Sequence, residues 1–491
     1  GILSMANKII LKAPQRYAQI AKKAEQVFPA QAVSTSEQKP SSLDYAVDAT
    51  TRSRPFFFLG VFGFCLILYL RFREAAVLAA LILLSAFSFL FAERFLIFLS
   101  PLIALGLGAF VSFLWSGKER FFTIIETVIK MLSRFLGSQK TVNLGSFPVG
   151  AAKGSFIATA SCVTLTAAIA WPSFYCLVTE LTSFQKIDGI RAAGMATLET
   201  LTPPDAVIWA WWDNGHAINY LARRKTVIDA ARHGRQYSVY NALPLAGSDE
   251  RLAANFIRFY AIRGFDGLNL VNQAAGGQKE GFQFIKKVLA LGPEKAGPLI
   301  SSAGLSPIHG RSDTAAWLSF FFPDRSYPLY LYLDNLSLFT AFWWYWYGTW
   351  DPERQDGVHP YYEPFFSITF NEDNRDAVIG GSRGLKIFPA SGIASLAEGT
   401  FPLSHILIRT ETKTLTRQYK YPPDSYVFEM AAGAHLGIMM DTDISESVFN
   451  RLFVRIDTGM KYFTPVSLDT PNYQVWKVHG DEYDGTLEKK D

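Results

Sequence analysis

Two adjacent tryptophans followed by an aspartate, Trp211–Trp212–Asp213, are the residues of this sequence best suited to chemistry. They directly follow Ala206–Ala210, a short apolar run that predicts a β-strand. An indole N–H only donates hydrogen bonds and an ionised carboxylate only accepts them. At a strand end they could hold a small hydroxyl group, with the carboxylate accepting its proton. The alternative is a pair of core tryptophans followed by an aspartate in a turn.

The flank of this cluster carries a family resemblance. The run AVIWAWWDNGHAINYLARRKTVIDAARHG (206–234) resembles the signature of the oligosaccharyltransferase catalytic subunit. In that family a WWD-type motif with a following glycine opens the soluble domain and binds the Ser or Thr two residues after the acceptor Asn. The resemblance implies that Trp211, Trp212 and Asp213 bind this hydroxyl. Asn214 departs from the pattern, because the family usually has Tyr there.

Two cationic positions are implied to bind the lipid pyrophosphate. Glu93–Arg94 resembles the family's arginine at an external helix end, and the forked guanidinium suits a diphosphate. An arginine there could instead only extend its charged end to the membrane surface. Arg232–His233–Gly234 is similar to a bacterial stretch of the family. His233 could assist Arg94, or it could bond only to nearby backbone.

A metal-binding residue is implied further upstream. Ser36–Glu37–Gln38–Lys39–Pro40 resembles the external-loop motif whose glutamate binds the catalytic divalent cation, magnesium or manganese, and helps to hold the acceptor peptide. On that resemblance Glu37 is the catalytic and metal-binding residue. The alternative is an exposed glutamate in a polar linker. One carboxylate is not a metal site, since such cations need several oxygen ligands.

The segment Tyr330–Thr340 resembles the part of the family that completes the hydroxyl pocket with an apolar pair. Leu336 and Phe339 fall near those two positions and keep their apolar character. The late runs SESVFNRLFVRID and NYQVWKV match the family's terminal helix and strand, so the resemblance extends along nearly the whole chain.

The resemblance implies a reaction and its partners. The enzyme transfers an oligosaccharide from a polyprenyl-pyrophosphate lipid to the amide nitrogen of an Asn-x-Ser/Thr acceptor, with inversion at the sugar carbon. The family carries further carboxylates in membrane loops that precede the position of Glu37. The chain starts at Gly1 without a signal peptide. We therefore expect a fragment of a longer, monomeric enzyme that is inactive alone.

Composition and hydropathy predict a membrane part followed by a globular part. Among the 491 residues, 49% are hydrophobic, 15% aromatic and only 18% charged, which is low for a soluble protein. The net charge of +4 is too small to indicate a nucleic-acid partner. Apolar segments long enough to cross a bilayer predict four spans, at about 55–70, 75–92, 95–115 and 155–178.

The arrangement predicts three regions: an external loop (1–54), a transmembrane domain (55–178) and an extracytoplasmic domain (179–491). Basic residues after the first and third spans predict that those loops are cytoplasmic. The family's fold is of the GT-C glycosyltransferase type, and the flank of His233 favours a bacterial inner membrane with a periplasmic C-terminal domain.

The globular part is predicted to be mixed α/β with a strand-rich second half. Helices are expected at Asp249–Arg263, Gly281–Leu291, Thr314–Phe321 and Ser445–Phe453. Strands are expected at Ala206–Ala210, Thr226–Asp229, Tyr327–Leu333, Pro364–Phe370, Leu385–Pro389, Ser404–Thr410, Tyr426–Met430, His435–Met440 and Tyr473–Val478.

Two other functions remain open. One is another polyprenyl-dependent glycosyltransferase, which gives no reason for the WWD cluster. The other is a non-catalytic membrane protein whose outer domain binds peptide or sugar. A channel or transporter is disfavoured, because the spans carry almost no charged residues that would mark a pathway.

Overall fold

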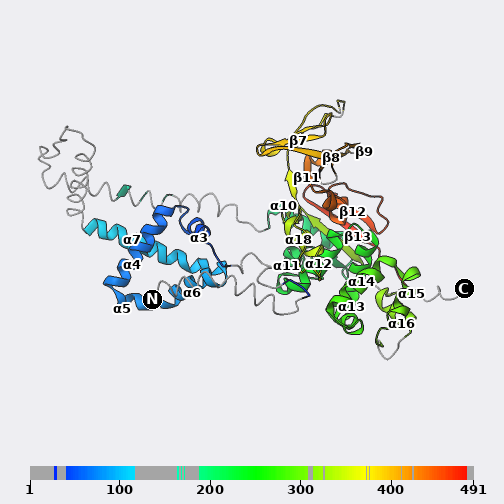
Figure 1. Ribbon diagram of the computed structural model, residues 1–491, viewed down its shortest axis with the longest axis horizontal. Coiled ribbons are helices and arrows are strands. Elements are labelled where there is room, and N and C mark those ends of the chain that lie inside the picture. The colour runs from blue at the N-terminus through cyan, green and yellow to red at the C-terminus, as the bar shows by residue number, and fades with distance from the viewer. Residues whose placement is uncertain are drawn as a thin grey trace, which may run out of the picture. The chain divides into compact units, whose positions relative to one another are not determined.

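The computed structural model forms two compact units (Figure 1). It describes residues 27–29, 40–116, 163–164, 167, 171 and 187–483, except 308–312, 325–326, 372, 375, 411 and 423–424. The first unit holds the helices between residues 40 and 116. The second holds residues 187–483 together with the short segment 27–29.

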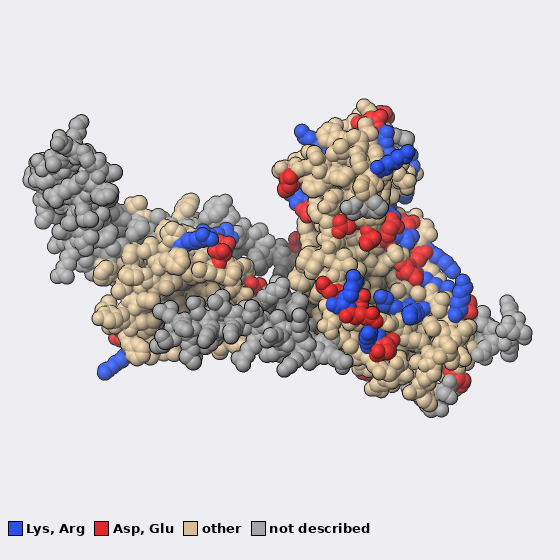
Figure 2. All heavy atoms as spheres, viewed as in Figure 1, with Lys and Arg blue, Asp and Glu red and all other residues tan. Residues whose placement is uncertain are grey.

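The first unit is helical and exposes large apolar side chains. Its elements are α3 (Leu43–Thr50), α4 (Arg54–Leu70), α5 (Phe72–Ala75), η2 (Ala76–Leu78), α6 (Ala79–Leu90), η3 (Glu93–Phe98) and α7 (Leu99–Ser116). Tyr69, Phe72 and Val77 are 84%, 71% and 84% exposed, and most of the described visible surface of this unit is uncharged, apart from a few small groups of basic and acidic residues (Figure 2). A soluble unit would bury such side chains, so this surface fits a lipid environment.

Two described helical stretches are long and apolar enough to cross a membrane, Phe72–Leu90 and Glu93–Phe113. They correspond to the expected second and third spans. The first expected span forms α4, which reaches that length only together with α3, across a bend of 89°. The fourth expected span lies almost wholly outside the described residues. The described helices therefore support a membrane part, but not the full set of four spans.

Helices α4 and α7 pack backbone to backbone through glycines. A Cβ on Gly63 would lie 1.9 Å from the carbonyl oxygen of Gly106, and one on Gly106 would lie 1.8 Å from that of Gly60. Small residues that allow such close approach are typical of helix pairs in membranes.

A five-stranded sheet forms the centre of the second unit. Its order is β12 (Phe463–Asp469), β13 (Tyr473–Val478), β3 (Leu329–Asp334), β1 (Val207–Trp209) and β2 (Lys225–Thr226). Strand β1 is parallel to both β2 and β3, with Trp209 opposite Leu331. Strand β13 is antiparallel to β3. The carboxyl ends of β1 and β3 therefore lie side by side at one edge.

Helices cover both faces of this sheet, as the alternation of its side chains requires. Ile208, Tyr330 and Tyr332 face α10 (Gly189–Leu201) and α11 (Gly215–Leu221). Trp209, Leu331 and Leu333 face the larger core. That core is built mainly by α12 (Arg235–Ala246), α13 (Glu250–Ala274), α14 (Gln278–Leu291), α15 (Pro293–Ser302), α16 (Thr314–Phe321), α18 (Ala341–Gly348) and α20 (Val448–Phe453).

An eight-stranded sheet forms the strand-rich second half (upper right in Figure 1). Its order is β4 (Tyr362–Phe365), β11 (Leu436–Met440), β10 (Tyr426–Ala431), β8 (Gly399–Arg409), β7 (Ile393–Leu396), β6 (Lys386–Phe388) and β5 (Ile379–Gly380), with β9 (Thr414–Gln418) also paired to β8. The remaining short elements are η5 (Trp212–Asn214), η6 (Ala230–Arg232), α17 (Leu336–Phe339), η7 (Ser382–Gly384), η8 (Ala432–Ala434) and α19 (Thr442–Ser445). The predicted mixed α/β domain is confirmed.

Most expected elements are present. Helix α16 and strand β13 have the expected bounds. Several expectations were wrong in detail, among them the strand expected at Pro364–Phe370, which is Tyr362–Phe365. The strand expected at Thr226–Asp229 is Lys225–Thr226, because Asp229 instead caps η6 by accepting from the amide of Ala231. The single late helix is two, α19 and α20, and Ser447 caps the second.

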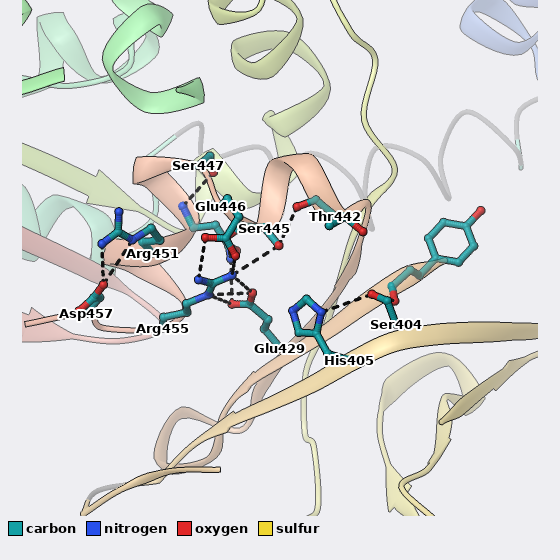
Figure 3. A network of polar contacts seen from close by, with 12 residues as sticks. Ser404, His405, Glu429, Thr442, Ser445, Glu446, Ser447, Arg451, Arg455 and Asp457 are labelled. Carbon is teal, nitrogen blue, oxygen red and sulfur yellow. Dashed lines mark hydrogen bonds and ion pairs between the residues drawn. The ribbon is translucent and has the colours of Figure 1, made fainter. Parts of the chain in front are cut away.

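A buried polar network connects the eight-stranded sheet to α19 and α20 (Figure 3). Glu429 of β10 is fully buried, and the Arg455 guanidinium contacts both its oxygens at 2.6–2.9 Å. Arg455 also pairs with Glu446 at 2.6 Å. Asn450 of α20 donates to Glu429 at 2.8 Å.

The segment 27–29 packs into the second unit although it precedes all the described helices of the first. Phe28 is 7% exposed and its ring lies 5.3 Å from that of Tyr240 and 5.7 Å from that of Phe282. The indole of Trp350 donates to the Val27 carbonyl at 2.9 Å. Within the expected external loop, this short segment is therefore part of the globular core.

Candidate acceptor-binding site

The WWD cluster lies at the carboxyl end of β1. In open sheets of this type, ligands bind outside the carboxyl ends of parallel strands. Trp211 is 2% exposed and packs near Tyr347. It is therefore a core tryptophan, as the alternative interpretation of the cluster predicts for both indoles. Trp212 is half-buried and Asp213 is exposed. The two residues that reach the surface are thus Trp212 and Asp213.

Asn241 of α12 fixes the backbone of this strand end. Its side-chain oxygen accepts from the amide of Trp212 at 3.0 Å, and its side-chain nitrogen donates to the Ala210 carbonyl at 3.0 Å. Its own carbonyl accepts from the indole of Trp209 at 3.2 Å. Since Asn241 is fully buried, these bonds are shielded from water and hold the chain where it leaves the sheet.

The loop that carries His233 folds back onto the cluster. The imidazole stacks on Trp212, with ring centroids 4.5 Å apart and planes 18° apart. Its Nδ1–H donates to the Ala230 carbonyl at 2.6 Å. This is a bond to nearby backbone, which is the alternative role expected for His233. Because a carbonyl oxygen can only accept, Nδ1 is the donor in this contact, and the bond fixes the orientation of the ring. His233 thus borders the WWD cluster as part of a rigid aromatic pair.

The local backbone geometry requires glycine at two positions of this region, Gly215 and Gly234. A Cβ on Gly215 would lie 2.5 Å from the Ile228 carbonyl oxygen, so only glycine lets the two segments approach. Gly234 has φ +81°, which favours glycine, and its amide donates to the Ser238 hydroxyl at 2.8 Å.

The segment with Leu336 and Phe339 forms α17 and follows β3 at the same sheet edge. Leu336 is half-buried and Phe339 is 62% exposed. The indole of Trp344 donates to the Ser337 carbonyl at 2.7 Å and fixes the helix. Phe339 also lines a cavity of about 580 Å³ with Phe342, Tyr361 and the paired Glu363 and Arg383. The lining of that cavity does not include Trp212 or Asp213.

A buried ion pair joins the two segments. Arg191 of α10 donates from Nε to Asp334 at 3.0 Å and from Nη2 to the side-chain oxygen of Asn214 at 2.7 Å. The other oxygen of Asp334 accepts from the Ser337 hydroxyl at 3.2 Å. Burial raises the pKa of the Asp334 carboxyl, and the Arg191 guanidinium opposes that rise.

The other expected site residues are not part of this cluster. Arg94 is exposed on η3 in the first unit. Glu37 lies outside the described residues. Among the residues that the structure describes, no three His, Cys, Asp or Glu side chains gather as metal ligands would. The described residues therefore do not form a divalent-metal site.

Sequence reasoning missed the residues that hold the cluster in place: Arg191, Asn241, Asp334 and Ser337. One signal was present for Asp334, because an aspartate that ends the apolar run LYLYLD is expected to need a buried partner. Nothing local pointed to Arg191, whose partners lie far along the chain.

Comparisons with known proteins match the region around the cluster. Residues 204–269 match the family model for the STT3/PglB/AglB core domain. The dolichyl-phosphooligosaccharide-protein glycotransferase of Methanocaldococcus jannaschii is 27% identical over 164 residues, which cover 32% of this chain and 17% of that protein. The match thus spans less than a fifth of that relative.

Among solved structures, the C-terminal domain of C. jejuni PglB aligns over 58% of this chain and 98% of its own length, with 14% identity and a TM-score of 0.37.

Proposed function

We propose that this chain serves in an oligosaccharyltransferase, on the premise of its similarity to the STT3/PglB/AglB core domain, whose family model matches residues 204–269. The observation that carries the proposal is the position of Trp212 and Asp213. They emerge from the carboxyl end of β1, beside α17 at the end of the parallel strand β3.

The geometry suits recognition of a small hydroxyl group. Asp213 is an exposed carboxylate that can accept a hydroxyl proton, and the half-buried indole of Trp212 offers a donor beside it. The apolar side chains of Leu336 and Phe339 would contact the carbon atoms of the same residue. The bound hydroxyl is therefore proposed to belong to the Ser or Thr side chain of an Asn-x-Ser/Thr segment, whose Asn is the acceptor.

The proposed reaction joins the acceptor Asn nitrogen to the sugar carbon, with inversion. The bond from that carbon to the pyrophosphate oxygen breaks, the amide loses one proton, and the polyprenyl pyrophosphate leaves. Because the amide lone pair is delocalised, positioning and stabilisation of the leaving group must supply much of the catalysis. Arg94 would neutralise the departing pyrophosphate, assisted by His233.

Glu37 would contribute one oxygen to a magnesium or manganese ion. The described residues supply no cluster of further ligands for that ion. The apolar helices of the first unit support a membrane location. We place the enzyme in the bacterial inner membrane as a monomer, with the second unit in the periplasm, where lipid-linked donor and acceptor polypeptide would meet.

Binding of a labelled Asn-Ala-Thr peptide tests the pocket. Asp213→Ala should weaken it at least tenfold, since hydrogen bonds to charged groups contribute about 1.5–3 kcal/mol. Asp373→Ala, at an exposed aspartate of the eight-stranded sheet region, is the matched control and should leave affinity unchanged. Equal affinity of the unaltered protein for Asn-Ala-Thr and Asn-Ala-Ala peptides would reject the hydroxyl pocket.

Because this chain is expected to be inactive alone, supply of lipid-linked donor and manganese then tests the reaction in the longer enzyme of which it is expected to be a fragment. Glycopeptide formation supports the transferase. Peptide binding without transfer would favour a non-catalytic peptide-binding protein instead.

A further inference from the structure

The two segments proposed to bind the acceptor hydroxyl come from different parts of the chain. Asp213 follows β1, and Leu336 and Phe339 follow β3. Pairing of the strands sets their backbones side by side only as far as Trp209 and Leu331. Beyond those residues both chains leave the sheet, and other contacts must hold their side chains at a fixed separation.

One guanidinium supplies those contacts. Arg191 is 6% exposed and bonds directly to Asn214, the neighbour of Asp213, at 2.7 Å. Its Nε bonds at 3.0 Å to Asp334, which is fully buried at the end of β3. Asp334 in turn accepts from Ser337, between the two apolar residues of α17, at 3.2 Å. A continuous chain of buried polar contacts therefore runs from one half of the pocket to the other.

We propose that Arg191 is a positioning residue that holds the two halves of the acceptor-hydroxyl pocket in register, acting through Asn214 on one side and through Asp334 and Ser337 on the other. This inference rests on the proposed function of the pocket. It also gives a role to Asn214, where the family usually has Tyr: its amide oxygen is the group through which the guanidinium reaches the turn.

The fork of arginine is essential to this role. Its nitrogens reach two acceptors in fixed directions, whereas a lysine ammonium is a single point charge on a flexible stem. Arg191→Lys therefore keeps the buried positive charge beside Asp334 but loses the second contact, to Asn214. Asn214→Ala removes that same contact and leaves the ion pair intact.

The test is the ratio of the dissociation constants for Asn-Ala-Ala and Asn-Ala-Thr peptides, measured on the full chain in detergent. Because both peptides meet the same folded fraction, misfolding alone does not change the ratio. We expect Arg191→Lys and Asn214→Ala each to reduce it about tenfold. Arg258→Lys is the control, since Arg258 is equally buried, at 6% exposure, but bonds to the Pro323 carbonyl.

A double variant separates positioning from stability. Arg191→Met with Asp334→Leu removes both buried charges, and such apolar replacements are often neutral for stability. We expect its thermal unfolding to lie closer to that of the unaltered protein than Arg191→Met alone, while its discrimination stays low. Full discrimination in Arg191→Lys, or equal loss in Arg258→Lys, would overturn the proposal. If the unaltered protein does not discriminate, the hydroxyl pocket fails, and the positioning role fails with it.

Discussion

Gly215 lies at the contact between the WWD turn and the loop that leads to His233. A side chain there would collide with backbone, since its Cβ would lie 2.5 Å from the Ile228 carbonyl oxygen. We expect Gly215→Ala to lower the free energy of unfolding by about 1–3 kcal/mol, as overpacking does, measured by chemical denaturation.

Gly247→Ala is the matched control for this prediction. Its φ is −73° and the nearest atom to its Cβ would be 3.7 Å away. Its free energy of unfolding should change by no more than about 0.5 kcal/mol. Equal effects of the two substitutions would show that the contact at Gly215 is not tight.

Single residues also show how far the site could be predicted. Trp212 and Asp213 could be assigned a place because they directly follow an apolar strand, and the strand formed. Trp211 could not be separated from them, because the sequence does not tell which indole turns into the core. Asn241 was missed, since its contacts to Trp212 and Ala210 require a helix that begins only after the following loop.

Among the elements, the pair α4 and α7 depends on a close backbone contact. A Cβ on Gly106 would lie 1.8 Å from the Gly60 carbonyl oxygen, whereas one on Gly108 would meet nothing within 4 Å. We expect Gly106→Ala to separate the two helices and to lower the thermal unfolding temperature in detergent. Gly108→Ala should leave it unchanged, and a similar shift for both would contradict the packing.

Helices whose apolar residues recur at helical spacing could be predicted from the sequence. A helix that is buried on most sides could not. The amphipathic helix α13 was expected because its apolar residues recur at helical spacing, and Asp249 caps it by accepting from the Leu252 amide. Helix α12 was missed. Most of its described residues are buried and it contains Pro244, so it shows no polar face that would reveal a period. Strand β8 begins earlier than expected, at Gly399, because that end pairs with β7.

At the scale of the whole second unit, Arg455 connects the eight-stranded sheet, through Glu429, to Glu446 between α19 and α20 (Figure 3). Arg455→Met would leave Glu429 buried without its counter-charge. We expect the free energy of unfolding to fall by about 3–5 kcal/mol, as for other broken buried pairs, measured by equilibrium denaturation.

The control for Arg455 is an exposed pair on the same sheet. Arg417 contacts Asp376 at 2.5 Å on the surface, and such pairs contribute at most about 1 kcal/mol. Arg417→Met should therefore have a small effect. A comparably small effect of Arg455→Met would mean that the network does not join the two parts.

The same network predicts a pH dependence. Burial lowers the pKa of His405, Arg455 lowers it further, and Glu446 opposes the shift. Since the unfolded chain then binds the proton more readily, stability should fall as pH decreases below the ordinary imidazole value of about 6.5. His405→Gln should reduce that slope in thermal unfolding measured between pH 7.5 and 5. An unchanged slope would assign the dependence to other groups.

The burial of Phe28 sets an order of events during synthesis. Its ring packs against Tyr240 and Phe282, which leave the ribosome only after all the helices of the first unit. Closing a loop of roughly 200 residues costs little more than closing a shorter one, and burying a phenylalanine side chain stabilises by about 1.5–3 kcal/mol. The segment around Phe28 can therefore pack only after Tyr240 and Phe282 have been synthesised. In a nascent chain halted before Phe282, Phe28 would still be accessible to chaperones and proteases.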